Sequence, residues 1–238
     1  MKKVLILPFI LFTLILYGQS ITSQIADPAT YLNDLKVEMQ KEWPKNRTIN
    51  LVFHGHSVPA GYFKTPQVNT ISAYPNLVLR KLKEIYPLAV VNVIVTAIGG
   101  ENSIKGAKRF EREVLIHKPD LIFIDYSLND RGPGLEKAYV AWGQMIKKAK
   151  RHGIKIILLT PSPDQSVSFA DPENPLKKHT DQVHKLAAKN QVGLADSFKA
   201  FEFLYPDKEQ LQKYMSQVNH PNEAGHELIA NEIMKWLK

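Results

Sequence analysis

Two segments of the chain supply a hydroxyl and an imidazole that could act together on a carbonyl group. Ser57 lies in the sequence HGHSVPAG at 54–61, at the end of an apolar run, and His220 lies in HPNEAGH at 220–226. A serine hydroxyl becomes a nucleophile when a base takes its proton and N–H groups stabilise the developing oxyanion. These residue types make Ser57 a candidate nucleophile and His220 a candidate base, although an ordinary structural role is the simpler interpretation of the Ser57 segment taken alone and an equal alternative for His220.

Two further segments carry groups that could stabilise an oxyanion. Gly100 lies in AIGGENS at 97–103, where two glycines let the backbone approach a ligand, and Asn129 lies in SLND at 127–130. Both segments follow apolar runs, as Ser57 does, and parallel α/β sheets bind ligands at the carboxyl ends of their strands. We expect Gly100 and Asn129 to lie near Ser57, with an ordinary turn as the alternative for each.

Metal and redox chemistry have little support in the residue types. The 238 residues include no cysteine, which excludes disulfides, a thiolate nucleophile and cysteine-ligated metals. His54 and His56 have a spacing found in some metal sites, but no Asp or Glu lies beside them. We therefore expect no metal and no cofactor, and any covalent catalysis must use oxygen or nitrogen.

The elements that would position these residues alternate between two patterns. Short apolar runs, typical of strands buried on both faces of a parallel sheet, cover 49–53, 90–95, 121–124, 154–159 and 192–195. Amphipathic segments with helical periodicity cover 75–85, 103–117, 134–152, 177–189 and 222–237. The alternation predicts the α/β class, as a three-layer α/β/α sandwich around a mainly parallel sheet of about five strands.

The N-terminus has the pattern of a targeting segment. Lys2 and Lys3 precede an apolar run over 4–17, which is shorter than the roughly 20 residues that a spanning helix needs. We expect a signal peptide over 1–23, a helical extension over 24–47 with its helix at 28–43, and one domain over 48–238. The protein would then be secreted or periplasmic without stable membrane insertion, and a retained anchor is the alternative.

The charge of the chain is positive but diffuse. Lys and Arg number 31 against 23 Asp and Glu, a formal net charge of +8. Its densest cluster, at 147–151, falls on the polar side of the segment 134–152, so these cations are expected to be solvated. Nucleic acid is therefore not an expected partner, and a weak attraction to acidic polysaccharide is the most that the charge indicates.

Taken together, the four segments resemble the blocks of the SGNH (GDSL-type) hydrolase superfamily, over roughly residues 48–238. Ser57, Gly100, Asn129 and His220 match the Ser, Gly, Asn and His of those blocks, with His56 where the family has Asp. The resemblance implies a flavodoxin-like SGNH fold, with Ser57 as nucleophile and His220 as base. It also implies an oxyanion hole formed by the N–H groups of Ser57 and Gly100 and the Asn129 side chain.

One departure from the family pattern bears on the base. The fourth block normally reads Asp-x-x-His, whereas Gln217 stands three residues before His220. In serine proteases, changing the triad Asp to Asn lowers turnover by about 10⁴. Three outcomes are open: the Gln217 carbonyl or a backbone carbonyl orients His220; another acid reaches it, the candidates being Glu101, Asp130 and Glu223; or the site is catalytically weak.

Two neighbours of Ser57 are candidates for substrate binding. His56 could bind substrate, tune the pKa of His220 or tie its own turn to the backbone, and the sequence does not choose among these. Tyr62 could line the pocket, because aromatic faces suit sugar rings.

The resemblance and the leader together predict a secreted serine esterase. It would act on a small-molecule or glycan ester, most simply an O-acetyl group on a carbohydrate, through a Ser57 acyl-enzyme. A lipase or lysophospholipase is the enzymatic alternative, and a catalytically weak glycan-binding homologue is the non-enzymatic one.

Overall fold

A parallel sheet forms the centre of the fold in the computed structural model, which describes residues 24–168, 171–204 and 207–238. Its order is β2-β1-β3-β4-β5, and every neighbouring pair is parallel. The strands are β1 (Thr48–Gly55), β2 (Val90–Val95), β3 (Leu121–Asp125), β4 (Lys155–Leu159) and β5 (Gly193–Ala195). The predicted sheet is thus confirmed in class, strand number and direction.

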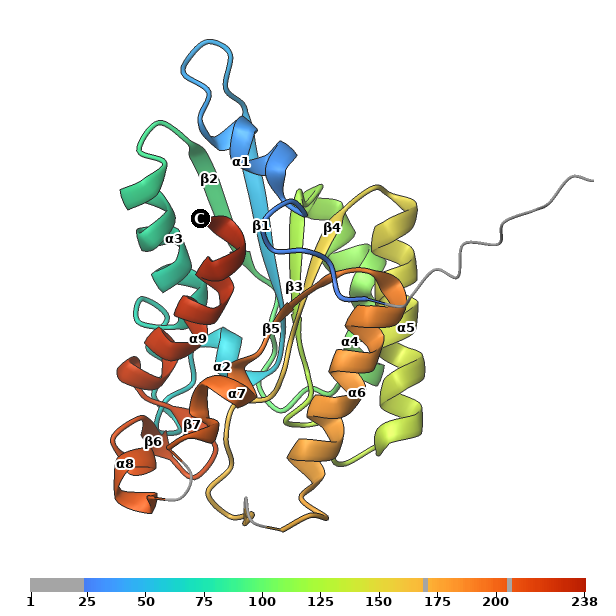
Figure 1. The fold of residues 1–238 in the computed structure, drawn as a ribbon, viewed down its shortest axis with the longest axis vertical. Helices are drawn as coiled ribbons and strands as arrows, with labels where there is room; N and C mark the ends of the chain where they lie inside the picture. The colour runs from blue at the N-terminus through green and yellow to red at the C-terminus, as the bar shows by residue number, and fades with distance from the viewer. Residues whose placement is uncertain (1–23, 169–170, 205–206) are drawn as a thin grey trace, which may run out of the picture.

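Helices cover both faces of the sheet and give three layers (Figure 1). One face carries α1 (Asn33–Met39), α3 (Tyr74–Ile85), α7 (Ser197–Glu202) and α9 (Glu223–Leu237). The other face carries α4 (Ser103–Glu113), α5 (Leu135–Arg151) and α6 (Pro175–Asn190). The three-layer α/β/α sandwich expected from the alternating pattern is therefore confirmed.

Successive strand residues feed two separate cores, which explains why the apolar runs are continuous. Leu51 and Phe53 of β1 belong to the core under α3 and α9, whereas Val52 between them packs under α4 and α5. The Phe53 ring stacks on that of Phe123 in β3, with centroids 4.2 Å apart. The edge strand β2 is only partly buried, because it has a neighbour on one side alone.

Several expected helix limits are wrong. The helix expected over 28–43 forms only over Asn33–Met39, because residues before it close into turns in which Thr30 and Tyr31 bond back to the Asp27 carbonyl. The segment 103–117 divides into α4 and a short 3-10 helix, η1 (Leu115–His117). Within the described residues no helix is long and apolar enough to cross a membrane. The predicted signal peptide at 1–23 lies outside the described residues.

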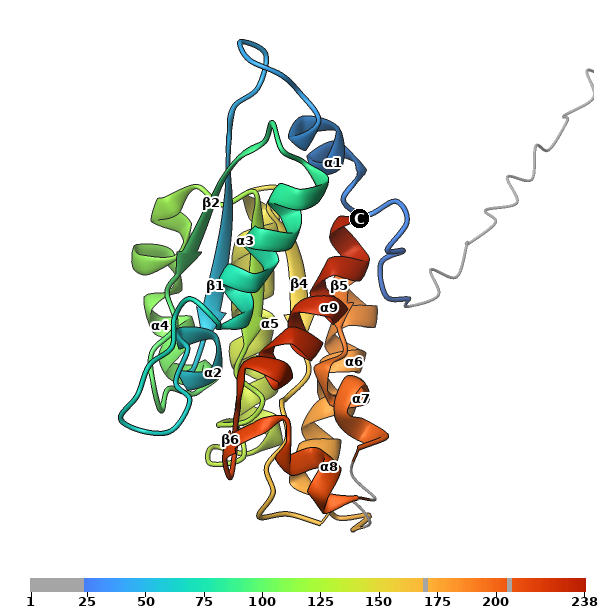
Figure 2. The ribbon, with the colours of Figure 1, turned by 90° about the vertical axis from the view of Figure 1, so that its left-hand side faces the viewer.

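The carboxyl edge of the sheet gathers short elements that the sequence patterns did not predict. These are α2 (Ser57–Ala60), α8 (Lys208–Gln212) and the antiparallel pair β6 (Met215–Gln217) and β7 (His220–Pro221). They lie in the lower half of the molecule in Figure 1, and Figure 2 shows α2, β6 and α8 there from a second side. Gly55 ends β1 here, and a Cβ at this position would lie 2.4 Å from the Asp125 carbonyl oxygen. A glycine therefore allows β1 to approach β3 closely just before Ser57.

Candidate active site

Ser57 and His220 are brought into contact from opposite ends of the domain sequence. Ser57 is the first residue of α2, immediately beyond β1, and His220 begins β7. The Ser57 Oγ lies 2.9 Å from His220 Nε2, and both residues are largely buried. The distance is that of a hydrogen bond between a hydroxyl and an imidazole, which is the contact that a serine nucleophile and its base require.

The second ring nitrogen of His220 has two neighbours, and neither is an acid. Its Nδ1 lies 2.9 Å from the backbone carbonyl oxygen of Phe63 and 2.7 Å from the Gln217 side-chain nitrogen. Among the residues that the structure describes, no carboxylate is bonded to His220. Burial lowers the pKa of His220, and the neighbouring His56 lowers it further, while the Phe63 contact acts in the opposite direction.

The three acids considered from the sequence as partners of His220 are bonded to other groups or exposed to solvent. Glu101 is paired with Arg109, whose Nε lies 2.9 Å from Glu101 Oε1. Asp130 accepts bonds from the Ser103 backbone N–H at 2.8 Å and from the Trp142 indole at 2.7 Å. Glu223 is exposed at the start of α9. The structure thus favours a backbone carbonyl over an acid as the group that faces Nδ1.

The loop that carries Gly100 is tied to the strand that leads to Ser57. The Ile98 backbone N–H donates to the Gly55 carbonyl at 3.0 Å, and the Asn129 side-chain amide donates to the Glu101 carbonyl at 2.9 Å. Gly100 has φ of +74°, in the left-handed region that favours glycine. These bonds draw Gly100 and Asn129 to the same end of the sheet as Ser57.

A buried network that the sequence analysis missed anchors this loop. The Arg109 guanidinium bonds to both carboxylate oxygens of Glu101 and to the Thr96 carbonyl, and the Tyr126 hydroxyl donates to Glu101 at 2.7 Å. The Glu101 backbone is the acceptor for Asn129. The sequence held no local signal for this pair, because Arg109 is one of several charged residues on α4 and its burial follows from tertiary packing.

His56 points into the protein rather than toward a ligand. The residue is 0% exposed; its Nδ1 accepts the Val58 backbone N–H at 3.2 Å, and its Nε2 lies 3.2 Å from Asp125 Oδ1. That second contact has an ion-pair distance but poor hydrogen-bond alignment. This placement opposes the substrate contact considered for His56 and favours a role in holding the turn around Ser57.

Tyr62 stands beside the Ser57–His220 pair. Its ring centroid lies 6.3 Å from that of His220, and its ring also packs on Gly99, where a Cβ would come within 3.1 Å of it. The half-buried ring therefore lies between the imidazole and the glycine pair at 99–100. This is a suitable position for the pocket-lining role considered from the sequence.

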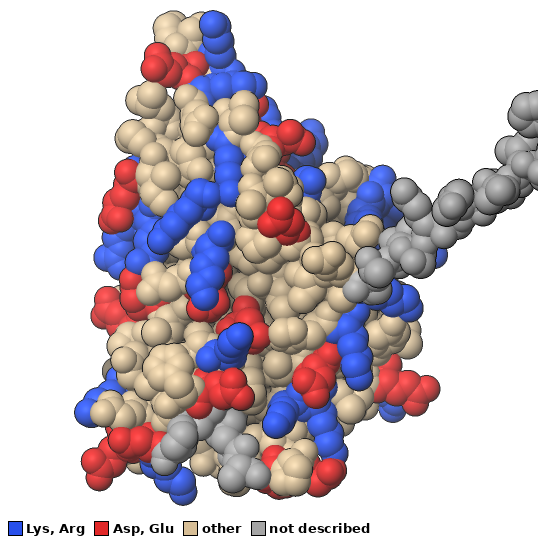
Figure 3. All heavy atoms as spheres, in the orientation of Figure 1, with Lys and Arg blue, Asp and Glu red and all other residues tan. Residues whose placement is uncertain are grey.

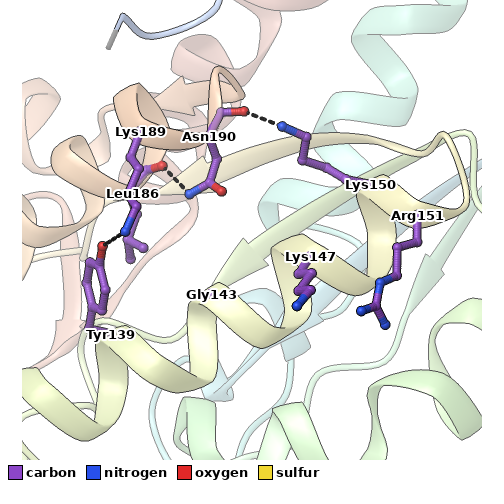
Figure 4. A pocket seen from close by; sticks show the side chains of 8 residues that line it. All are labelled: Tyr139, Gly143, Lys147, Lys150, Arg151, Leu186, Lys189 and Asn190. Atoms are coloured by element: carbon purple, nitrogen blue, oxygen red, sulfur yellow. Dashed lines mark hydrogen bonds between the residues drawn. The ribbon is translucent and has the colours of Figure 1, made fainter.

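The surface also carries a groove between two helices and a mixed distribution of charge. A groove of about 530 Å³ between α5 and α6 is lined by Tyr139, Gly143, Lys147, Lys150, Arg151, Leu186, Lys189 and Asn190 (Figure 4). Two of its lysines form hydrogen bonds between α5 and α6. Lys150 donates to the Asn190 carbonyl at 2.8 Å, and Lys189 donates to the Tyr139 hydroxyl at 2.9 Å. Figure 3 shows acidic and basic side chains interspersed on the face that it draws. In the described part of the chain, no group of three or more possible metal ligands was found.

The order of these elements and the Ser57–His220 contact agree with a family assignment. The model of the GDSL-like lipase/acylhydrolase family matches residues 53–228, which is most of the chain. The chain belongs to this family. As a GDSL-like acylhydrolase, the protein is a serine carboxylic-ester hydrolase.

Solved structures of esterases share the fold of this GDSL-like acylhydrolase. An acetylxylan esterase from Geobacillus stearothermophilus superposes with a TM-score of 0.66 at 21% identity, over 79% of this chain and 94% of that one. A two-domain esterase active on acetylated mannans gives 0.69 at 19% identity, over 92% of this chain and 55% of the other. A putative GDSL-like lipase from Parabacteroides merdae gives 0.68 at 16% identity, over 79% and 95%. A search among curated proteins gives no match.

Structures of catalytic mutants of the acetylxylan esterase mark three residues of that protein. These mutants replace a serine, a histidine and an aspartate that lies three residues before that histidine. In the present chain, Gln217 stands three residues before His220.

Proposed function

We propose that Ser57 and His220 form the catalytic dyad of a secreted esterase that removes O-acetyl groups from a carbohydrate. The observation that carries the proposal is the 2.9 Å contact between Ser57 Oγ and His220 Nε2 at the carboxyl edge of the sheet. The N–H groups of Ser57 and Gly100 and the Asn129 side-chain amide serve as oxyanion donors. The Asn129 amide has two N–H groups, so one is free for substrate while the other bonds to Glu101.

The reaction proceeds through an acyl-enzyme. His220 Nε2 takes the Ser57 hydroxyl proton as Oγ attacks the ester carbonyl, and the negative charge that develops on the carbonyl oxygen is stabilised by the oxyanion donors. The imidazolium then returns the proton to the leaving alcohol as the C–O bond breaks. A water molecule, deprotonated in turn by His220, attacks the acyl carbonyl. The bond to Ser57 Oγ then breaks, the imidazolium returns its proton to Oγ, and the carboxylic acid leaves.

The Phe63 carbonyl takes the orienting role of the missing acid. His220 Nε2 accepts the serine proton only if the neutral ring carries its own proton on Nδ1. The Phe63 carbonyl oxygen, 2.9 Å from Nδ1, can accept that proton's hydrogen bond. A neutral carbonyl stabilises the imidazolium less than a carboxylate does, so we infer slower turnover than a complete triad would give.

The substrate class rests on several supports. Two structural neighbours are described as acting on acetylated xylan and acetylated mannans. The half-buried Tyr62 ring lies beside His220, where an aromatic face can pack on a sugar. The charged and apolar pattern of residues 1–23 supports export to a compartment where such polymers occur.

The test is hydrolysis of p-nitrophenyl acetate, butyrate and octanoate by the leaderless protein and by Ser57→Ala. We expect acetate to be the best substrate and its turnover to be lost in the variant, and acetylated xylan or mannan then to release acetate. Preference for octanoate would instead favour a lipase. Absence of Ser57-dependent turnover on every ester would favour a glycan-binding homologue that has lost catalysis.

A further inference from the structure

Gln217 competes with Phe63 for the same nitrogen of His220. The Gln217 Nε2 lies 2.7 Å from His220 Nδ1, and the Phe63 carbonyl oxygen lies 2.9 Å from it. An amide nitrogen only donates hydrogen bonds, and a carbonyl oxygen only accepts them. Nδ1 therefore cannot satisfy both neighbours. When Nδ1 carries a proton, it donates to the Phe63 carbonyl, and that proton faces the N–H group of Gln217. When Nδ1 carries no proton, it accepts from Gln217, and its lone pair faces the Phe63 carbonyl oxygen.

The orientation of the Gln217 amide is determined by the loop that follows Phe63. The Thr65 backbone N–H donates to Gln217 Oε1 at 3.1 Å, and Gln217 Nε2 lies 3.4 Å from the Thr65 hydroxyl oxygen. Turning the amide over would place its NH₂ group against the Thr65 N–H, so that two donors would face each other. The orientation that satisfies Thr65 thus presents an N–H group to His220.

We propose that Gln217 acts as a brake on the catalytic base by favouring the tautomer of His220 that carries its proton on Nε2. In that tautomer Nδ1 accepts from Gln217 and the Nε2–H group donates to Ser57 Oγ, so the serine proton has no acceptor on the ring. The reactive tautomer forms when the ring proton moves to Nδ1 and bonds to Phe63. This inference deepens the proposed function, since it rests on His220 being the base.

A carboxylate of the same length would remove the conflict. In Gln217→Glu, one carboxylate oxygen accepts the Thr65 N–H and the other accepts the His220 Nδ1–H. The Thr65 hydroxyl can turn to donate as well, so every donor then faces an acceptor. Among the described residues, the other titratable groups near His220 are His56 and His226, which influence it electrostatically, and Tyr62, whose ring lies near the imidazole. All three are unchanged in the variant.

The direct test is the tautomer of His220, read from long-range ¹H–¹⁵N NMR correlations of the imidazole ring at pH 8. The His220 signals are assigned by their loss in His220→Asn. We expect the proton mainly on Nε2 in the wild-type protein and on Nδ1 in Gln217→Glu. A wild-type ring protonated on Nδ1 would overturn the proposal.

Kinetics on p-nitrophenyl acetate provide the second test. Gln217→Glu should raise kcat by about tenfold or more and move the acid limb of the pH profile to higher pH, because the carboxylate favours the imidazolium. Gln217→Met removes both the donor and the acceptor at similar length, and its kcat should equal or exceed that of the wild type. A lower kcat in Gln217→Met would mean that Gln217 supports the base, contrary to the proposal.

Gln212→Glu is the matched control, because it adds the same charge at an exposed position on nearby α8. Its kcat and pH profile should match those of the wild type, and an equal gain in this variant would contradict a specific effect at position 217. If no variant hydrolyses any ester, the proposed function fails, while the NMR result still decides whether Gln217 sets the tautomer.

Discussion

The ring of Phe63 stacks on the ring of His226, with centroids 5.0 Å apart and 11° between their planes. His226 is fully buried, and its Nδ1 accepts the Tyr74 backbone N–H at 3.2 Å. Tyr74 in turn donates its hydroxyl to Asp125 at 3.1 Å, beside the fully buried His56. The Phe63 ring therefore packs on a buried polar network, and this packing positions the Phe63 backbone carbonyl that faces His220.

Removing this stacking should weaken catalysis without removing any catalytic group. In Phe63→Ala the carbonyl remains, but the loop loses its packing on His226, so the contact with His220 Nδ1 becomes less well aligned. We expect kcat on p-nitrophenyl acetate to fall by about tenfold with little change in KM. Phe203→Ala, at a position 72% exposed, is the control; an equal loss there, or an unchanged kcat in Phe63→Ala, would contradict the role of the loop.

Asn129 should act mainly by stabilising the transition state. Its side chain is held by the Glu101 carbonyl at the edge of the sheet where Ser57 lies, and loss of one oxyanion donor typically lowers kcat by about 10² to 10³. We expect Asn129→Ala to show that loss on p-nitrophenyl acetate, with a smaller effect on KM. Asn231→Ala, at an exposed position on α9, should leave kcat unchanged; a change confined to KM in Asn129→Ala would place Asn129 in substrate binding instead.

The Arg109–Glu101 pair should matter for stability. Arg109→Met leaves the Glu101 carboxylate buried without its cation, which typically costs about 3–5 kcal/mol of unfolding free energy. Urea unfolding followed by circular dichroism measures this loss. Arg112→Met is the matched control, because the Arg112 side chain on the same helix is 80% exposed and should cost less than about 1 kcal/mol. Similar losses in the two variants would argue against the buried pair as an anchor.

The pH profile of hydrolysis should reflect the environment of His220. The base must be neutral, and burial together with His56 lowers its pKa below the usual value of about 6.5. The rate therefore rises with pH as His220 loses its proton, and the midpoint of this acid limb in kcat/KM should lie below 6.5. A midpoint clearly above 6.5 would show that a nearby negative charge stabilises the imidazolium after all.

Acid should destabilise the fold beginning at mildly acidic pH. Burial lowers the pKa of His54 and His226 to about 3 and that of His179 to about 4. Between those values and about 6.5 the unfolded chain binds more protons than the folded one, so unfolding free energy falls as pH falls. The urea midpoint should be lower at pH 5 than at pH 7.5. His179→Leu should reduce this pH dependence, whereas an unchanged difference would exclude His179 from it.

Much of the architecture follows from local patterns in the sequence. Strands buried on both faces are apolar at nearly every position, so the runs at 49–53 and 121–124 were identifiable without tertiary information. Helix limits were less predictable, as the shortened α1 shows, because turns at helix ends depend on single hydrogen bonds such as those to the Asp27 carbonyl. Short elements such as β6 and β7 have too few residues to show any period.

The sequence by itself also indicated which residues are available for chemistry. Each of the candidates lies at the end or the start of a predicted element, where an α/β sheet binds its ligands; they are Ser57, Gly100, Asn129 and His220. Only the tertiary structure decided what surrounds them. The contacts of His220 with Ser57 and Phe63 join residues more than 150 positions apart, and the burial of His56 depends on how β1 packs beside β3. Hydrogen-bond partners, burial and pKa arise from groups distant in the chain, and no local pattern encodes them.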